Sequence, residues 1–261
     1  MRNQHAKQIL AMLISIFCAS AFVLPPERSL GQTAKLTVQA DRPGPKVSPT
    51  LYGIFFEEIN CAGDSGLYAE LIRNRSFEDT DKPDHWLLVA DGTAKGEIGI
   101  DDTLPMSAKN PHSLKLTIAS GGKGRVGVGN DGYWGIAVQK DAAYELSFSA
   151  RAADGFSGPL TVTLESADAK VVYAQAAIGG LTVGWNTFKA ALVSTGTNPK
   201  ARMVISAYQP GTVWLDMVSL FPKKTWKDRP NGLRPDLAEM LNGLKSSFVR
   251  FPAAAGSKGT R

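Results

Sequence analysis

The stretch YGIFFEE at residues 52–58, together with FVRF at residues 248–251, decides how the chain is organised. Residues 52–56 form a mostly apolar run without helical spacing, which predicts a strand buried on both faces in a parallel sheet. Residues 248–251 predict a second strand. A helix before it is indicated by apolar residues at helical spacing, with Pro235 suited to the first turn: Leu233, Leu237, Met240, Leu241 and Leu244. Strand, helix and strand in this order predict a βαβ crossover.

Two shorter patterns lie near the first strand. Residues 35–40 alternate between apolar and polar side chains, which predicts a strand that the following prolines and glycine end. Leu67 and Leu71 stand four residues apart, as do Tyr68 and Ile72, and this spacing predicts a short helix.

The region between the two halves of the crossover has a different character. It contains seven short, often alternating apolar runs, each bounded by Gly, Asp, Asn or Pro, and this pattern is typical of an antiparallel β-sandwich. The runs are residues 113–118, 144–150, 160–165, 171–176, 185–192, 202–207 and 213–220. We therefore expect a mainly β chain in which a complete sandwich, residues 85–222, interrupts a βαβ unit.

The N-terminus predicts export. Arg2, His5 and Lys7 precede an apolar run at residues 9–19, the layout of a secretory signal peptide. The run is shorter than the ~20 apolar residues of a membrane span. We assign residues 1–34 to a signal peptide and leader, and we expect a secreted or periplasmic protein with no stable membrane anchor after cleavage; an uncleaved anchor is the alternative.

Composition excludes several classes of function. The chain has 261 residues, of which 43% are hydrophobic and 20% charged, enough to bury a core. Without the leader's three basic and one acidic residues, 26 basic and 23 acidic side chains remain, too balanced for a nucleic-acid partner. Cys61 is then the one cysteine and no internal disulfide forms. Isolated histidines and the lack of a phosphate-binding glycine loop predict no metal and no cofactor.

YGIFFEE, the segment GLYAELIRNRSFE at residues 66–78 and VRFP at residues 249–252 together resemble the start of the catalytic domain of glycoside hydrolase family 51, the α-L-arabinofuranosidases. The resemblance implies the start of a (β/α)₈ barrel: an N-terminal strand and first βα segment at residues 35–84, then barrel helix 1 and strand 2 at residues 223–252. The sandwich is similar to a jelly-roll carbohydrate-binding module inserted between them. Where the family continues Gly-Gly, this chain has Ala253 and Ala254, so we expect an aberrant tail at residues 253–261 and a truncated barrel.

The resemblance also implies roles for two residues. Glu57, at the end of the first strand, matches a glutamate that binds sugar hydroxyls, and Arg250 matches an arginine that lines the active site. The acid/base and nucleophile glutamates of this retaining family come from later barrel strands, and no residue here matches them. We assign no catalytic residue and expect the chain to be inactive alone. The alternative for Glu57 is a solvated pair with Glu58 in a loop, and the alternative for Arg250 is an exposed arginine near a frayed end of the chain.

The loop NDGYWG at residues 130–135 carries the remaining candidates. Aromatic rings stack on sugar faces and amides bond hydroxyls, so Asn130, Tyr133 and Trp134 are predicted to bind substrate; a tryptophan in a sandwich core is the alternative. The implied function is the N-terminal part of an exported arabinofuranosidase that acts on arabinose-substituted plant polysaccharides such as arabinoxylan or arabinan. The alternatives are a secreted carbohydrate-binding module without catalysis and a purely structural sandwich.

Overall fold

The computed structural model describes residues 34–251. The predicted signal peptide and the predicted aberrant tail therefore fall outside the described residues, apart from residue 34. The chain divides into two units at residues 47 and 48. In the described part of the first unit, residues 34–47, every side chain is exposed and there is no helix or strand. The predicted strand at residues 35–40 is therefore wrong: alternation alone does not form a strand where, among the described residues, no other strand pairs with the segment.

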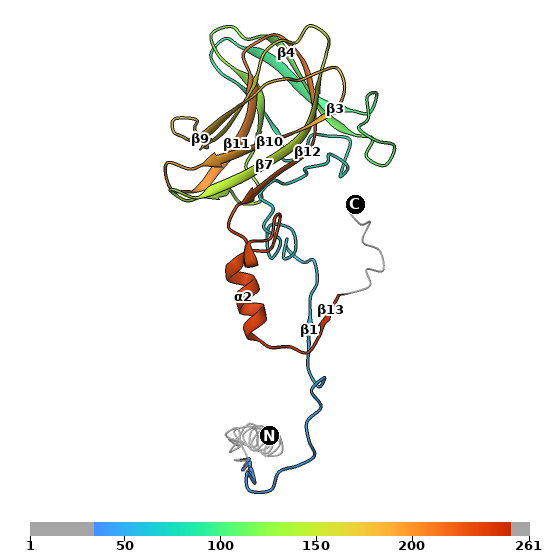
Figure 1. Ribbon diagram of the computed structural model, residues 1–261, viewed down its shortest axis with the longest axis vertical. Helices are drawn as coiled ribbons and strands as arrows, with labels where there is room; N and C mark the ends of the chain where they lie inside the picture. The colour runs from blue at the N-terminus through green and yellow to red at the C-terminus, as the bar shows by residue number, and fades with distance from the viewer. Residues whose placement is uncertain (1–33, 252–261) are drawn as a thin grey trace, which may run out of the picture. The chain divides into compact units, whose positions relative to one another are not determined.

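The second unit contains a β-sandwich of two antiparallel sheets (Figure 1). One sheet has five strands in the order β10-β7-β12-β4-β3: Asn186–Val193, Ala143–Ala152, Gly211–Pro222, Ser113–Ser120 and Lys95–Asp101. The other has the order β2-β5-β11-β8-β9, with β6 also paired to β11: Leu87–Ala90, Val126–Asn130, Asn198–Ala207, Leu160–Ser166, Val172–Ile178 and, for β6, Ile136–Val138. All seven predicted strands are confirmed. The strands β2, β3, β5 and β6 were not predicted.

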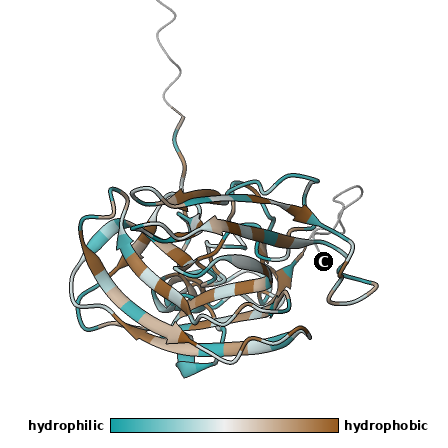
Figure 2. Cartoon of the chain, turned by 90° about the horizontal axis from the view of Figure 1, so that it is seen from above, coloured by the Kyte–Doolittle hydropathy of each residue, from teal (hydrophilic) through white to brown (hydrophobic). Residues whose placement is uncertain are grey.

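Alternation along each strand builds the core between the sheets. In β8, Leu160, Val162 and Leu164 are fully buried and belong to the core cluster, whereas the intervening Thr163 and Glu165 face the other side of the sheet. The same alternation of hydrophobic and hydrophilic residues runs along neighbouring strands in Figure 2. Full burial of each aliphatic side chain contributes roughly 1.5–3 kcal/mol, so the sandwich rests on this interior.

The core of the sandwich begins earlier in the chain than residue 85, the boundary that the sequence predicts. Ile72 and Phe77 are fully buried members of the same core cluster. The rings of Phe77 and Trp86 lie 5.4 Å apart, and the Trp86 Nε1–H donates to the Asn74 carbonyl at 3.0 Å. The segment that leads into the sandwich is therefore packed as part of it.

Glu70 explains why the predicted helix at residues 67–72 is wrong. Its buried Oε1 accepts the N–H groups of Leu71 and Ile72, both at 3.0 Å, and that of Leu220 at 2.9 Å. Its Oε2 accepts the Ser219 hydroxyl at 2.6 Å. Burial raises the pKa of Glu70, and the hydrogen bonds from Ser219, Leu220 and Ile72 oppose that rise. The local bonds to Leu71 and Ile72 and the tertiary bonds to Ser219 and Leu220 take the place of helical hydrogen bonds.

The segments by which the chain enters and leaves the sandwich are bonded to each other. We call residues 67–72 together with residues 218–234 the neck. The Arg234 N–H donates to the Leu67 carbonyl at 2.9 Å, and the Ala69 N–H donates to the Gly232 carbonyl at 3.2 Å. The ring of Tyr68 lies edge-on to that of Phe221, with centroids 5.1 Å apart. The two passages of chain are therefore bound to each other at the neck.

The βαβ unit is formed by the chain segments that precede and follow the sandwich. Strands β1 (Ile54–Phe55) and β13 (Val249–Arg250) pair in parallel. They flank the short 3₁₀ helix η1 (Trp226–Asp228) and helix α2 (Pro235–Gly243), which has Pro235 in its first turn as predicted. Parallel pairing is confirmed, but burial on both faces is wrong, because Phe55 is 57% and Val249 49% exposed. Among the described helices, none is long and apolar enough to cross a bilayer.

The β3–β4 loop, residues 102–112, lies over the outer face of the five-stranded sheet. The Leu104 carbonyl accepts the Trp185 Nε1–H at 3.0 Å, and the Asn110 amide donates to Asp216 at 2.6 Å. Asp216 also accepts the Met217 N–H at 2.6 Å and is fully buried. Burial raises the pKa of Asp216 to about 7 against these hydrogen bonds.

The first prediction concerns the neck. Glu70→Ala leaves the Ile72 and Leu220 N–H groups and the Ser219 hydroxyl without this acceptor, whereas the Leu71 N–H keeps the Leu220 carbonyl at 3.0 Å. The variant should therefore lower the free energy of unfolding by about 3 kcal/mol or more. Glu70→Gln keeps an acceptor oxygen and should cost at most about 1.5 kcal/mol. Urea unfolding followed by tryptophan fluorescence measures both. Equal losses for the two variants would contradict the role given to this carboxylate.

The second prediction concerns pH. Because the pKa of Asp216 rises from 3.8 to about 7 on folding, its contribution to stability is complete below pH 3.8 and is lost as pH rises toward 7, by up to about 1.4 kcal/mol per pH unit. Asp216→Asn should make that fall shallower, and the part that remains belongs to Glu70, whose pKa is also raised by burial. The control is Asp168→Asn, at an exposed carboxyl with a pKa of about 2, which should leave the profile between pH 4 and 7 unchanged. A wild-type slope that survives in Asp216→Asn would refute the assignment.

Candidate functional site

The parallel strand pair brings Glu57 and Arg250 to the same end of one small sheet. The Ile54 N–H donates to the Phe248 carbonyl at 3.0 Å and the Phe56 N–H donates to the Arg250 carbonyl at 2.9 Å. Glu57 directly follows this bonded residue. Both Glu57 and Arg250 are exposed. Ligand sites of parallel α/β folds lie at the carboxyl ends of the strands, which is where these two side chains stand.

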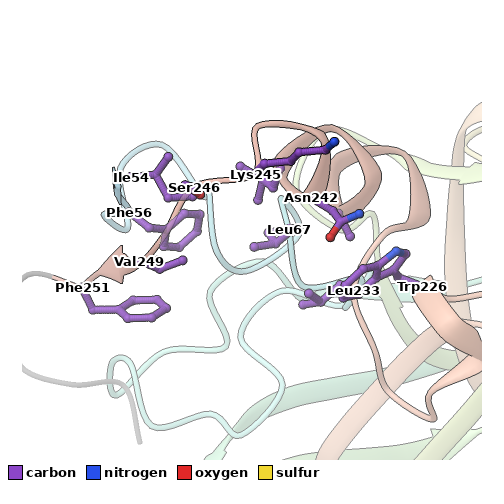
Figure 3. A pocket seen from close by; sticks show the side chains of 12 residues that line it. Ile54, Phe56, Leu67, Trp226, Leu233, Asn242, Lys245, Ser246, Val249 and Phe251 are labelled. Atoms are coloured by element: carbon purple, nitrogen blue, oxygen red, sulfur yellow. The ribbon is translucent and has the colours of Figure 1, made fainter. Parts of the chain in front are cut away.

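The two faces of this strand pair differ. Ile54, Phe56, Val249 and Phe251 face α2 and line a mostly apolar cavity of about 320 Å³ (Figure 3). Phe55 and Arg250 are partners in the register, so alternation places them on the opposite face. The cavity is the space between the strands and their crossover helix. Glu57 and Arg250 are not among its lining residues.

Glu57 and its neighbour Glu58 are not arranged as a catalytic pair. The Glu58 Oε2 accepts the Asp64 N–H at 3.2 Å, so this carboxylate is committed to the loop that follows β1. No group of three or more metal-ligating side chains occurs in residues 34–251.

The second set of candidates lies in the loop after β5, where Asn130 is 1% exposed. Its Oδ1 accepts the Gly132 N–H at 2.9 Å, and its Nδ2 donates to the carbonyls of Arg73 at 2.9 Å and His85 at 3.2 Å. The Asn130 amide therefore holds the loop in place. That Asn130 contacts substrate stays a prediction.

The two aromatic residues of the loop that Asn130 holds, Tyr133 and Trp134, differ in exposure. Trp134 is 69% exposed, whereas Tyr133 is half-buried, with the Arg73 guanidinium 5.6 Å from its ring centroid. Burial, and then the charges of Asp64 and Glu70, raise the pKa of Tyr133, so its phenol keeps its proton. The rings of Tyr133 and Trp134 are tilted by 38° with centroids 6.2 Å apart. Trp134 is thus an exposed flat apolar surface on a fixed loop.

Arg73 contacts the aromatic loop, although no sequence pattern assigned it a role. It contacts Tyr133 with its guanidinium and Asn130 with its main chain. Arg73 and the loop are separated by 57 residues and meet only in the fold. A periodic pattern within one segment carries no signal for such a contact.

Comparison with known proteins adds to this geometry. No family model matches the chain. The extracellular exo-alpha-L-arabinofuranosidase of Streptomyces chartreusis is 39% identical over 224 residues, which are 83% of this chain and 25% of that protein. Alpha-L-arabinofuranosidase A of Aspergillus kawachii is 33% identical over 238 residues, 88% of this chain and 36% of that protein. These relatives are arabinofuranosidases.

A solved structure agrees with the curated relatives. The arabinose-bound MgGH51 α-L-arabinofuranosidase superimposes with a TM-score of 0.72 at 36% identity, over 81% of this chain and 35% of that chain. The match confirms the resemblance to glycoside hydrolase family 51 in both sequence and fold. The chain spans between 25% and 36% of the length of these relatives. The roles of Glu57, Arg250, Tyr133 and Trp134 stay predictions.

The third prediction tests the brace under the aromatic loop. Asn130→Ala removes the hydrogen-bond partner of the Arg73 and His85 carbonyls and of the Gly132 and Arg73 N–H groups, so the free energy of unfolding should fall by about 1–3 kcal/mol. The neighbouring Asp131 is exposed, and Asp131→Ala should change it by less than about 0.5 kcal/mol. Chemical unfolding of both variants provides the measurement. Equal stability of Asn130→Ala and the wild type would show that the amide is not needed to hold the loop.

Proposed function

We propose that this chain is the polysaccharide-binding N-terminal part of an exported α-L-arabinofuranosidase that acts on arabinose-substituted plant polysaccharides such as arabinoxylan or arabinan. The observation that carries the proposal is the match to an arabinose-bound arabinofuranosidase at a TM-score of 0.72. The parallel pairing of β1 with β13 supports it, because this pairing puts Glu57 and Arg250 at one sheet end. Export follows the predicted leader and the Streptomyces relative named extracellular.

Within this proposal the two parts of the chain have different tasks. Glu57 and Arg250 contact the arabinose unit, the former through sugar hydroxyls and the latter through charge and hydrogen bonding. The sandwich is a jelly-roll carbohydrate-binding module inserted in the barrel that begins with β1. In it, Trp134 stacks on a sugar ring of the polysaccharide, since its exposed indole offers the flat apolar surface that such stacking needs. Tyr133 supports the indole and offers its neutral phenol as a hydrogen-bond donor.

The 261-residue polypeptide is proposed to bind without cleaving. Retaining glycosidases need an acid/base and a nucleophile carboxyl about 5–5.5 Å apart. The family resemblance assigns these two roles to glutamates of later barrel strands, and it assigns neither role to Glu57 or Glu58. We therefore expect no hydrolysis of an aryl arabinofuranoside by this polypeptide.

A second candidate function is favoured by the exposure of Trp134 alone: a secreted carbohydrate-binding module without any catalytic partner. It also predicts that Trp134 binds a sugar ring, but it predicts no higher affinity for arabinose-substituted chains than for unsubstituted ones. Arabinoxylan oligosaccharides and the same oligosaccharides stripped of arabinose separate the two. A clear preference for the substituted chains supports the arabinofuranosidase, and equal affinity supports the general module.

The fourth prediction combines binding and hydrolysis. In calorimetry, the 261-residue polypeptide should bind arabinoxylan or arabinan oligosaccharides, and Trp134→Ala should weaken that binding by about tenfold or more. Its stability should change little, because the side chain is 69% exposed.

Two control variants and one assay complete the test. Trp134→Phe keeps an aromatic face and should retain most of the affinity. Val183 is also exposed, at 57%, and Val183→Ala should behave as the wild type. Failure of the wild type to bind any arabinose-substituted glycan would overturn the proposed function, and release of aryl alcohol from the arabinofuranoside would overturn the proposed lack of hydrolysis.

A further inference from the structure

A groove separate from the aromatic loop lies on the sandwich sheet that contains β8 and β9. It has a volume of about 320 Å³, at the lower end of the range for ligand sites. It lies on the face of the sheet that points away from the core: Leu160, Val162 and Leu164 of β8 are in the core, whereas Thr161, Thr163 and Glu165 line the groove. The remaining lining residues include Asp91, Lys123, Arg125, Val172, Gln175 and Tyr208.

The floor of the groove is a fixed network of charges. The fully buried Glu165 carboxylate accepts hydrogen bonds from Arg125 at 2.9 Å, from Arg202 at 2.8 and 3.0 Å, and from the Thr163 hydroxyl at 2.8 Å. Asp91 accepts the Arg125 Nε–H at 2.8 Å. Burial raises the pKa of Glu165, but the bonds from Arg125, Arg202 and Thr163 outweigh this and hold it below its usual value. The network is therefore ionised and rigid.

The side chains that line this groove are electrically balanced and leave a donor available. Two carboxylates, Asp91 and Glu165, stand against two cations, Lys123 and Arg125. Arg202, which is not among the lining residues, pairs with Glu165. Arg125 donates one hydrogen bond each to Asp91, Thr163 and Glu165, and its Nη1 also lies 2.8 Å from the Glu165 Oε2. A guanidinium has five N–H groups, so these contacts leave at least one N–H without a partner among the described residues, on a side chain that lines the groove.

The walls of the groove supply further polar groups and an aromatic ring. The Thr161 hydroxyl and the Gln175 amide line it, and within residues 34–251 neither side chain has a hydrogen-bond partner. Tyr208 borders it with 56% of its surface exposed. Neutral donors and acceptors around a charge-balanced floor, next to an exposed ring, fit a ligand that is uncharged, flat-faced and rich in hydroxyls. A phosphate or a polyanion would instead need an excess of positive charge.

We propose that this groove binds a neutral sugar unit of a polysaccharide, as a second glycan subsite of the sandwich apart from Trp134. The inference rests on the proposed function for the class of ligand. In the bound state, Gln175, Thr161 and the free Arg125 N–H bond sugar hydroxyls, and Tyr208 lies against the sugar face. Two subsites on one module raise its affinity for a long chain above that for a short one, provided that the chain reaches both.

The experiment uses the 261-residue polypeptide and neutral arabinoxylan oligosaccharides in calorimetry. Gln175 and Tyr208 are exposed, so their substitution should leave thermal unfolding unchanged. Gln175→Ala and Tyr208→Ala should each weaken binding by about threefold to tenfold. Tyr208→Phe should keep the ring's share of the affinity. The control Lys189→Ala, at an exposed position on β10 of the other sheet, should bind as the wild type.

The outcomes separate this inference from the proposed function. If the wild type binds and only Trp134→Ala weakens it, with both groove variants at wild-type affinity, the groove is not a glycan subsite and the inference fails while the proposed function stands. If the wild type binds no glycan, the proposed function fails. Acidic oligogalacturonates serve as a second probe, and tighter binding of these than of neutral oligosaccharides would overturn the assignment of a neutral ligand.

Discussion

The arrangement of this chain depends on one buried carboxylate, that of Glu70. It accepts hydrogen bonds from the N–H groups of its own segment and of Leu220, and from the Ser219 hydroxyl. These bonds join the segment that enters the sandwich to β12, its last strand. Without it, these donors would be buried and unsatisfied at the point where the chain enters the sandwich. The aromatic loop is attached just after the same segment, because the Asn130 amide donates to the Arg73 carbonyl and accepts the Arg73 N–H.

The sandwich treats its two outer faces differently. The face of the five-stranded sheet is covered by the β3–β4 loop, and Asp216 is held there with a raised pKa. The opposite face carries Glu165, also fully buried, but with a lowered pKa because two arginines surround it. Both acids are equally buried, so their pKa values shift in opposite directions because their hydrogen-bond and charge partners differ. The protein itself covers the Asp216 part of one face, and the other face keeps polar groups available to solvent and ligands.

Much of the fold could be predicted from the sequence, and the failures have physical causes. Seven strands were predicted because their alternation matches a half-buried sheet. Strand β5 was not, since Gly127 and Gly129 weaken its pattern; a Cβ at Gly127 would lie 2.4 Å from the Ile205 carbonyl. The spacing of residues 67–72 suits a helix, yet tertiary bonds to Glu70 override it. Of the site, Trp134 was found from its loop, but the burial of Asn130 depends on partners far away in sequence. The polar alternation of Thr161, Thr163 and Glu165 was a signal that could have indicated the groove.

The bonds between residues 67–69 and residues 232–234 mean that the sandwich begins and ends at a single point. A module with adjacent termini occupies one loop of its host and does not stretch or reroute the strands on either side. Because its ends are adjacent, the sandwich can be replaced at this position by another domain with equally close ends. By the same argument, it can be inserted into an unrelated protein through junctions near residues 67–69 and 232–234.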